Sequence, residues 1–134
     1  MCPLCSCRLW TVHCRLLFVY GSLRRGFQAH GLMRRLSGRY IGKGSVRGRL
    51  FDLGDFLGAV KTPAASARVA GELYHLPCAA ALKSLDRYEG KRYRRDLADI
   101  KLRGGKRVRG WIYWLKRAPA LQHLLQEGDY ATCR

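Results

Sequence analysis

The number and order of its strand-like and helix-like segments predict an α+β domain with a mixed or barrel-like β-sheet. Five segments have strand character, whereas only two have clear helical character. The two kinds do not alternate along the chain, which argues against a βαβ fold. A length of 134 residues with 48% hydrophobic residues suits one core. We therefore expect a single domain over residues 15–134.

The predicted strands are rich in aromatic, β-branched and other apolar residues. They span residues 16–20, 45–53, 68–76, 93–102 and 107–114. The last of them alternates with a period of two: Val108, Ile112 and Trp114 share one face, and Tyr113 lies on the other. This strand should therefore present different side chains to the two sides of the sheet.

The helical signals are fewer. Pro77 opens an alanine-rich segment, and Gly90 is suited to its C-terminal cap. A second short helix is predicted at 119–126. Residues 27–44 are rich in Gly and Arg, and they are interpreted as a loop around a short helical turn.

Residues 1–14 differ in composition from the rest of the chain and match no periodic pattern, so we expect an appendage outside the fold. They hold four of the six cysteines, which is not the pattern of a disulfide framework spread through a secreted domain. Cys2, Cys5, Cys7, His13 and Cys14 could bind zinc, but structural zinc sites normally pair two separated knuckles. No metal site is predicted.

Positive charge dominates the composition, with 26 Lys and Arg against 9 Asp and Glu and a formal net charge of +17. Such a charge attracts polyanions, so a nucleic-acid-binding protein is one alternative. The mixture of Arg and aromatic residues at 107–114 favours it. The segment lacks the aromatic arrangement of an RNP motif, however, and the basic residues are spread along the chain, so nucleic acid is not the expected partner. Oligomeric state stays open.

Neither a membrane span nor a signal peptide is predicted. No segment approaches the ~20 apolar residues of a spanning helix. Charged residues and a histidine interrupt the N-terminal apolar run. With these cysteines, the reducing cytoplasm is the expected compartment.

The first predicted strand ends in the turn Tyr20-Gly21-Ser22-Leu23. A glycine here lets a ligand approach the main chain closely, and free N–H groups at such a turn bind anions. One interpretation is a cradle for an oxyanion or a carboxylate, to which Ser22 adds a hydroxyl. The other is an ordinary turn at the end of a strand. Four residues do not decide between them.

A carboxylate at the end of the alanine-rich helix is the second candidate. Leu82, Leu85 and Glu89 follow helical spacing, so Glu89 should continue the face that the two leucines turn to the core. An acid on an apolar face has its ionised form disfavoured, which raises its pKa toward that of a useful general base. Alternatively the helix frays, and Glu89 pairs in solvent with a basic residue of 91–94.

Two other carboxylates are relevant to this assignment. Glu72 alternates with Ala70 and Tyr74 on one strand face and is the second candidate for an inward carboxylate. Asp86 lies one turn before Glu89 on a different face, and it is expected to be a surface or capping group.

An ordered set of segments carries a resemblance to a known family. They are FVYGSLRRG (18–26), GRLFDLGDFLGAV (48–60), VAGELYHL (69–76), LDRYEGKRYRR (85–95), GWIYW (110–114) and EGDY (127–130). Together they resemble the γ-glutamylcyclotransferase-like family, in particular its AIG2-like branch, which includes γ-glutamylamine cyclotransferase. The resemblance covers essentially residues 16–130.

The resemblance implies a fold and a site. The family's fold is a small, twisted mixed β-barrel with a few short helices around a central cavity. The turn after its first strand holds the glutamyl part of the substrate through backbone amides. The residues that match family positions are Tyr20, Gly21, Ser22 and Leu23 for substrate binding, Tyr113 for the cavity lining and Glu89 for the catalytic base.

The resemblance also implies an activity. Enzymes of this type cyclise a γ-glutamyl amine or peptide to 5-oxoproline and release the amine, without a metal or an organic cofactor. The expected partner is thus a small γ-glutamyl molecule. A different γ-glutamyl or amide-processing lyase on the same scaffold is the nearest alternative.

Overall fold

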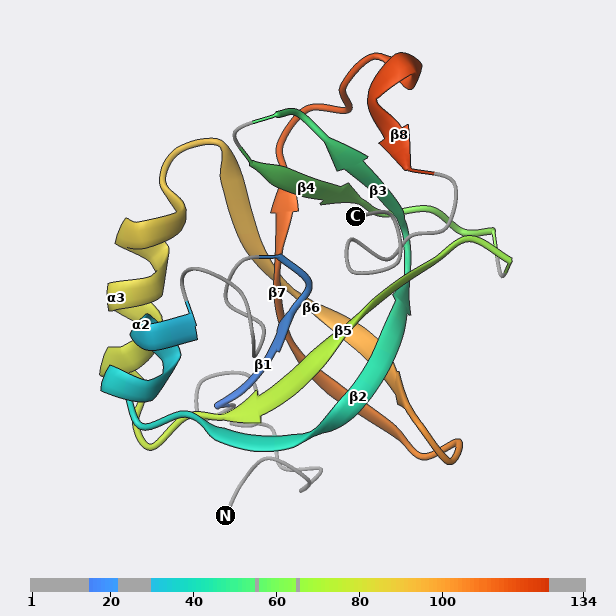
Figure 1. The fold of residues 1–134 in the computed structure, drawn as a ribbon. Coiled ribbons are helices and arrows are strands. Elements are labelled where there is room, and N and C mark those ends of the chain that lie inside the picture. The colour runs from blue at the N-terminus through green and yellow to red at the C-terminus, as the bar shows by residue number, and fades with distance from the viewer. Residues whose placement is uncertain (1–14, 22–29, 55, 65, 126–134) are drawn as a thin grey trace.

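A closed five-stranded barrel forms the centre of the protein (Figure 1). The computed structural model describes residues 15–21, 30–54, 56–64 and 66–125. Around the barrel the strands follow the order β1 (Leu16–Val19), β5 (Arg68–His75), β2 (Arg39–Arg47), β6 (Tyr93–Leu102) and β7 (Arg107–Leu115). Neighbouring strands are antiparallel except β1 and β7, which are parallel and pair Leu17 with Trp111. The expected mixed barrel is confirmed.

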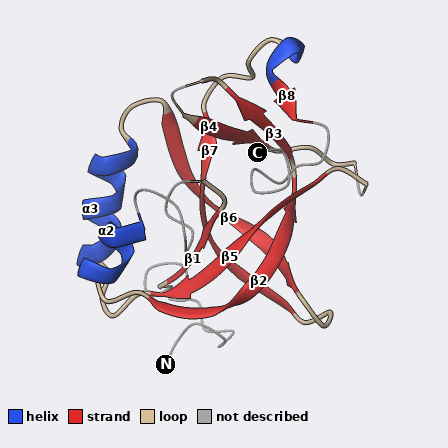
Figure 2. Cartoon of the chain, in the orientation of Figure 1, coloured by secondary structure: helices blue, strands red, loops and turns tan. Residues whose placement is uncertain are grey.

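A second sheet and two helices complete the described fold. The sheet has the order β4 (Leu57–Val60), β3 (Arg49–Asp52) and β8 (Leu124–Leu125), and all its pairs are antiparallel. The helices α2 (His30–Arg35) and α3 (Ala80–Glu89) lie together on one side of the barrel (Figure 2). A single 3₁₀ turn, η1, spans Leu121–His123.

Two apolar clusters lie on opposite faces of the barrel strands. The inner cluster fills the barrel and reaches the small sheet: Leu16, Phe18, Tyr20, Val46, Leu50, Ala59, Val69, Leu73, Ile100, Val108, Ile112 and Trp114. The outer cluster packs the helices against the barrel: Leu17, Val19, Met33, Tyr74, Leu76, Ala81, Leu82, Leu85 and Tyr113. The predicted alternation on β7 is thus confirmed, because Trp114 faces inward and Tyr113 faces the helices.

The helix α3 is placed as its sequence predicts. Ala81, Leu82 and Leu85 are buried, and Gly90 caps the C-terminus with a φ of 82°, donating its N–H to the Asp86 carbonyl. Two glycines with φ near 100°, Gly104 and Gly105, form the turn between β6 and β7. These features fix where α3 ends and how the β6–β7 hairpin folds back beside it.

Two segments differ from the prediction. Residues 39–44 belong to the strand β2 rather than to a loop, because they pair with β5. The helix predicted at 119–126 is wrong: only Leu121–His123 form a 3₁₀ turn, and Leu124 and Leu125 pair with Phe51 and Leu50 as β8. The single strand predicted at 45–53 is divided: its first residues belong to β2, and its later residues form the short strand β3. The segment after it forms a second short strand, β4.

The cysteine-rich residues 1–14, predicted to be an appendage, lie outside the described residues. No helix in the described part of the chain has the length and apolar character to cross a membrane.

Candidate active site

Glu89 is the last residue of α3, on the face that Leu82 and Leu85 bury. Its side chain is partly buried, and burial raises the pKa of its carboxyl from 4.5 to about 7. No hydrogen bond or ion pair joins it to another described residue, so the pairing considered for segment 91–94 does not form there. The helix therefore delivers a carboxyl group that can take up and release a proton near neutral pH.

Three tyrosines lie near enough to this carboxyl for its charge to act on their hydroxyls: Tyr20, Tyr93 and Tyr113. Burial is the main cause that raises the pKa of each hydroxyl, and the charge of Glu89 adds to it in all three. All three hydroxyls therefore stay protonated at neutral pH and can act as hydrogen-bond donors. They come from the end of β1, the start of β6 and the end of β7, so the fold brings distant segments together around Glu89.

The buried Tyr20 ties the end of β1 to two other strands. Its hydroxyl donates to the Tyr113 carbonyl at 2.6 Å and accepts the Ala59 N–H at 3.0 Å. Both bonds are buried, so they fix the first residue of the predicted substrate-binding turn in the core. Its hydroxyl proton is used within the protein, which leaves the main chain of the turn as the part able to contact a ligand.

Gly21 follows Tyr20 and lies beside β4. A β-carbon built on it would lie 3.9 Å from Leu57, an ordinary contact distance, so the protein itself leaves room there. The Leu57 carbonyl accepts a hydrogen bond from the Tyr93 hydroxyl. Leu57 is thus shared between the turn after β1 and the tyrosine next to Glu89. Ser22 and Leu23, predicted to complete the turn, lie outside the described residues.

Asp86 holds α3 against the β6–β7 hairpin. It accepts a hydrogen bond from the Tyr113 hydroxyl at 2.7 Å and two from the Arg95 guanidinium at 2.8 and 3.1 Å. Burial opposes ionisation of Asp86, but the Arg95 and Tyr113 hydrogen bonds outweigh it and hold its pKa below the ordinary value. Arg95 in turn stacks over the Trp111 ring, 4.4 Å from its centroid.

Asp86 lies at the surface, as the sequence predicts, but its side chain also makes contacts that the sequence does not indicate. Its side chain is 41% exposed, but its oxygens are used in a network that spans three elements. Tyr113, predicted to line the cavity, is 5% exposed and directs its hydroxyl to this network. Arg95 and Tyr93 were missed because their partners lie on other elements, so no local spacing indicates the contacts.

Glu72 is the second buried carboxylate. It is 4% exposed, and its Oε1 accepts the Tyr74 hydroxyl at 2.9 Å on the face that Tyr74 presents to the helices. Glu72 is thus buried, as predicted, but on the helix-facing side of the barrel rather than inside it. Unlike Glu89, it has a tyrosine donor directly on one oxygen.

A test of the Glu89 environment needs no substrate. The melting temperature of Glu89→Gln minus that of the wild type should be several degrees larger at pH 8 than at pH 4.5. Because burial raises the folded-state pKa from 4.5 to about 7, the ionised carboxylate costs up to about 3 kcal/mol of stability above pH 7, and this cost disappears below pH 4.5. Glutamine carries no charge at either pH. Thermal denaturation of both proteins across this range measures the difference, and a pH-independent difference would contradict the raised pKa.

No group of three or more His, Cys, Asp or Glu side chains that could hold a metal ion lies in the described ranges. Glu89 can transfer a proton near neutral pH, and nearby hydroxyls and main-chain amides can donate hydrogen bonds.

Known proteins resemble this chain both in sequence and in fold. The family model described as gamma-glutamyl cyclotransferase, AIG2-like, matches residues 17–132. A protein of Methanocaldococcus jannaschii, named "Putative gamma-glutamylcyclotransferase", is 32% identical over 120 residues, which are 88% of this chain and 97% of that protein.

Solved structures share the fold at lower identity. An AIG2-like protein from Mus musculus superposes with a TM-score of 0.75 at 24% identity, over 87% of each chain. An uncharacterized protein from Pyrococcus horikoshii gives 0.69 at 18% identity, over 89% of this chain and 92% of that one. YkqA from Bacillus subtilis gives 0.72 at 23% identity; 88% of this chain is covered, but only 40% of YkqA.

Proposed function

The chain belongs to the gamma-glutamyl cyclotransferase, AIG2-like family, and on this basis we propose that it cyclises a γ-glutamyl amine or peptide to 5-oxoproline and releases the amine. The observation that carries the proposal is Glu89: a partly buried carboxyl with a pKa near 7, unpaired among the described residues, close to Tyr20 at the start of the predicted cradle.

The proposed reaction begins at the α-amine of the substrate. This amine is protonated at neutral pH and must lose a proton before its nitrogen can attack the γ-carbonyl carbon. Two protons must move from the α-nitrogen to the leaving nitrogen, and Glu89 is the proposed relay, because its raised pKa allows it to receive a proton and later return it to the leaving amine. The new N–C bond closes the five-membered ring, and the γ-amide C–N bond breaks.

The turn after β1 is proposed to stabilise the charge that develops on the γ-carbonyl oxygen. Main-chain amides of Gly21, Ser22 and Leu23 would act as preorganised donors and hold the glutamyl group. Tyr20 supports this role because its hydroxyl anchors the turn to β4 and β7. Holding the folded-back substrate in a reactive conformation can supply a large part of the roughly 7–11 kcal/mol available from orientation.

Tyr113 and Asp86 are proposed to shape and position the site. Tyr113 would form part of its wall, and its bond to Asp86 fixes α3 relative to β7. Asp86 lies one turn before Glu89, so the Asp86–Arg95 pair sets where the base lies. No metal or organic cofactor is needed, because nucleophile and electrophile belong to one molecule and the proton transfer needs only a carboxylate.

The experiment that tests this function is a panel of γ-glutamyl amines and peptides, assayed for released 5-oxoproline with the full chain. Release from at least one compound is expected, and the compound with the highest kcat/KM identifies the leaving group. If none yields 5-oxoproline while another product of γ-amide cleavage forms, the alternative of a different γ-glutamyl-processing lyase is favoured. No turnover of any compound would contradict both.

The cradle makes a separate prediction at Gly21. Gly21→Ala should weaken substrate binding at least tenfold, because the methyl group occupies the space where the ligand is proposed to approach the main chain. The protein accommodates this methyl group, since its nearest neighbour would be Leu57 at 3.9 Å. The melting temperature should therefore stay close to that of the wild type. Unchanged affinity in this folded variant, measured by calorimetry with a slow substrate analogue, would rule out the cradle.

A further inference from the structure

A cavity of about 320 Å³ lies where two barrel strands separate. β2 and β6 pair only at Gly44 with Leu102 and at Ser45 with Lys101, and beyond these pairs they diverge. The cavity is lined by Val46, Arg47, Lys61, Thr62, Arg68, Leu97, Ala98, Asp99, Arg107 and Trp114. It shares no residue with the candidate active site.

The lining is strongly cationic. Arg47, Lys61, Arg68 and Arg107 line it with one carboxylate, Asp99, and Lys61 pairs with Asp96 at 2.9 Å outside the lining. Asp99 is already engaged, because it pairs with Arg109 at 3.3 Å outside the lining. Among the described residues, none of the three lining arginines forms an ion pair with a carboxylate. Like charges gathered in a cavity without matching acids favour an anionic ligand.

Arg68 is held in place before any ligand arrives. Its Nε donates to the Ser45 hydroxyl at 2.8 Å, and its Nη2 donates to the Ser45 carbonyl at 3.0 Å. Partial burial, followed by the charges of Arg107 and Arg47, lowers the pKa of Arg68. The charges of Arg47 and Arg107 therefore act on Arg68, and an anion bound among these groups would relieve this repulsion.

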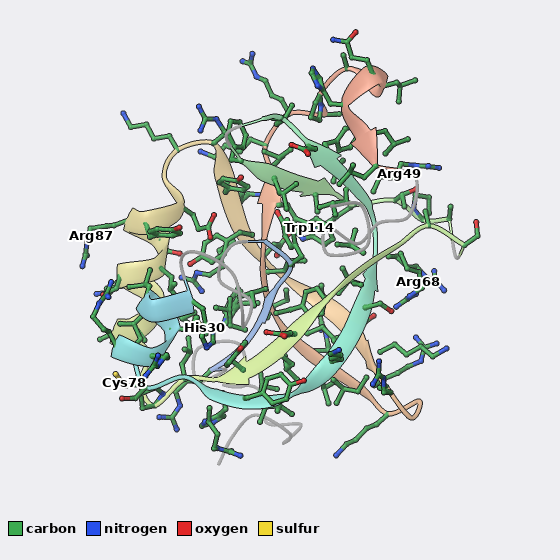
Figure 3. The ribbon with its side chains drawn as sticks, in the orientation of Figure 1. His30, Arg49, Arg68, Cys78, Arg87 and Trp114 are labelled. Atoms are coloured by element: carbon green, nitrogen blue, oxygen red, sulfur yellow. The ribbon has the colours of Figure 1, made fainter. Side chains whose placement is uncertain are left out.

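Trp114 forms the apolar wall of the cavity. It is 3% exposed, and its indole N–H is buried without an acceptor among the described residues. Buried donors in native proteins rarely lack a partner. The Lys61 ammonium lies 5.9 Å from the centre of its ring. In Figure 3, Trp114 lies near the middle of the molecule, whereas Arg68 lies at the edge of the barrel, on the side opposite Arg87 of α3.

We propose that this cavity is a second binding site, for a small organic anion that carries at least two negative charges on clustered oxygens. Arg47, Arg68 and Arg107 would bind the oxygens, and the apolar part of the ligand would lie against Trp114. The site is independent of the proposed cyclisation, since Tyr113 and Trp114 lie on opposite faces of β7 and Glu89 is not among the lining residues.

Isothermal titration calorimetry with pyrophosphate and with citrate tests the site, at an ionic strength near 0.15 M so that long-range attraction is screened. Saturable binding of at least one anion with a stoichiometry of one is expected. Tighter binding of pyrophosphate assigns a phosphorylated ligand, and tighter binding of citrate assigns a polycarboxylate. Absence of saturable binding of both anions would overturn the proposal.

Matched variants distinguish binding at this cavity from general attraction by the positive charge of the protein. Arg68→Gln and Arg107→Gln should each weaken binding tenfold or more, because each removes charge-assisted hydrogen bonds. Arg107 is exposed and its side chain has no ion pair with a described residue, so this variant is expected to fold even if Arg68→Gln does not. Arg87→Gln removes the same charge on the far side and should leave affinity within twofold. Equal weakening by Arg87→Gln and Arg107→Gln would show that no specific site exists.

Discussion

Turnover of a γ-glutamyl substrate is expected to fall by about 10²–10⁴-fold in Glu89→Gln, the range for loss of a general base. Glutamine keeps the shape of the side chain but cannot accept the α-amine proton. Ground-state binding should change far less, so the loss should appear in kcat rather than in KM. In the wild type, kcat/KM should decrease below about pH 7, because the base must be ionised to act and burial places its pKa there. Steady-state kinetics of 5-oxoproline release across pH 5–9 measures both effects.

Glu72→Gln is the matched control for this result. Glu72 is also a buried carboxylate, but it accepts the Tyr74 hydroxyl on β5 and is assigned no part in the reaction. The variant should keep its rate within a fewfold, once its melting temperature shows that it folds. Full activity of Glu89→Gln combined with inactivity of a folded Glu72→Gln would move the base from α3 to β5.

Gly71→Ala should destabilise the barrel by at least about 3 kcal/mol, which corresponds to a fall in melting temperature on the order of 10 °C. A β-carbon at Gly71 would overlap the Val19 carbonyl oxygen and lie 2.7 Å from Cζ of Phe18. The carbonyl belongs to the backbone of β1, so relief requires the strand itself to move. Thermal or urea denaturation of the two proteins gives the difference.

Gly42→Ala controls for glycine replacement as such. It lies on β2, and a β-carbon built there meets no atom within 4 Å. Its melting temperature should stay within a few degrees of the wild-type value. Should Gly71→Ala melt at the same temperature as Gly42→Ala, the close approach of β1 and β5 would not be a determinant of stability.

The alternating strands and the helix with the clearest apolar face could be predicted from the sequence. β6 and β7 and the C-terminal half of α3 lie where their periodicity places them, because burial on a fixed face is encoded within each segment. The start of β2 could not be predicted. Its Gly and Arg residues have low strand propensity, and pairing with β5 along its whole length outweighs that propensity.

The short C-terminal segment shows a second limit. Leu121, Leu124 and Leu125 have helical spacing, but a run this short fits a helix and a strand equally well. The edge of β3 decides the outcome, since it offers unpaired backbone groups to Leu124 and Leu125. No local pattern could indicate this, because the partner lies about 75 residues earlier in the chain.

In the candidate site too, features set within one segment could be predicted, whereas contacts between distant segments could not. The inward face of Glu89 could be predicted from two leucines on its own helix, and its burial follows from that face. The contacts of Asp86 with Arg95 and Tyr113 could not, because they join a helix to two strands whose relative position depends on barrel closure. Local spacing thus locates the proton acceptor but not the residues that position it.

The way the barrel closes has a consequence for local opening. The β6–β7 hairpin is held together by backbone pairing along nearly its full length, yet it joins the rest of the barrel through one residue pair to β1 and two to β2. Separation along these two seams would break few backbone pairs, so the hairpin is held in the barrel chiefly by apolar packing of residues such as Ile112 and Trp114. The hairpin carries Tyr93, Arg95 and Tyr113 on one side and Ala98 and Trp114 on the other. Opening of this one unit would therefore change the surroundings of Glu89 and of the cationic cavity together, and amide hydrogen exchange of the hairpin measures how readily it opens.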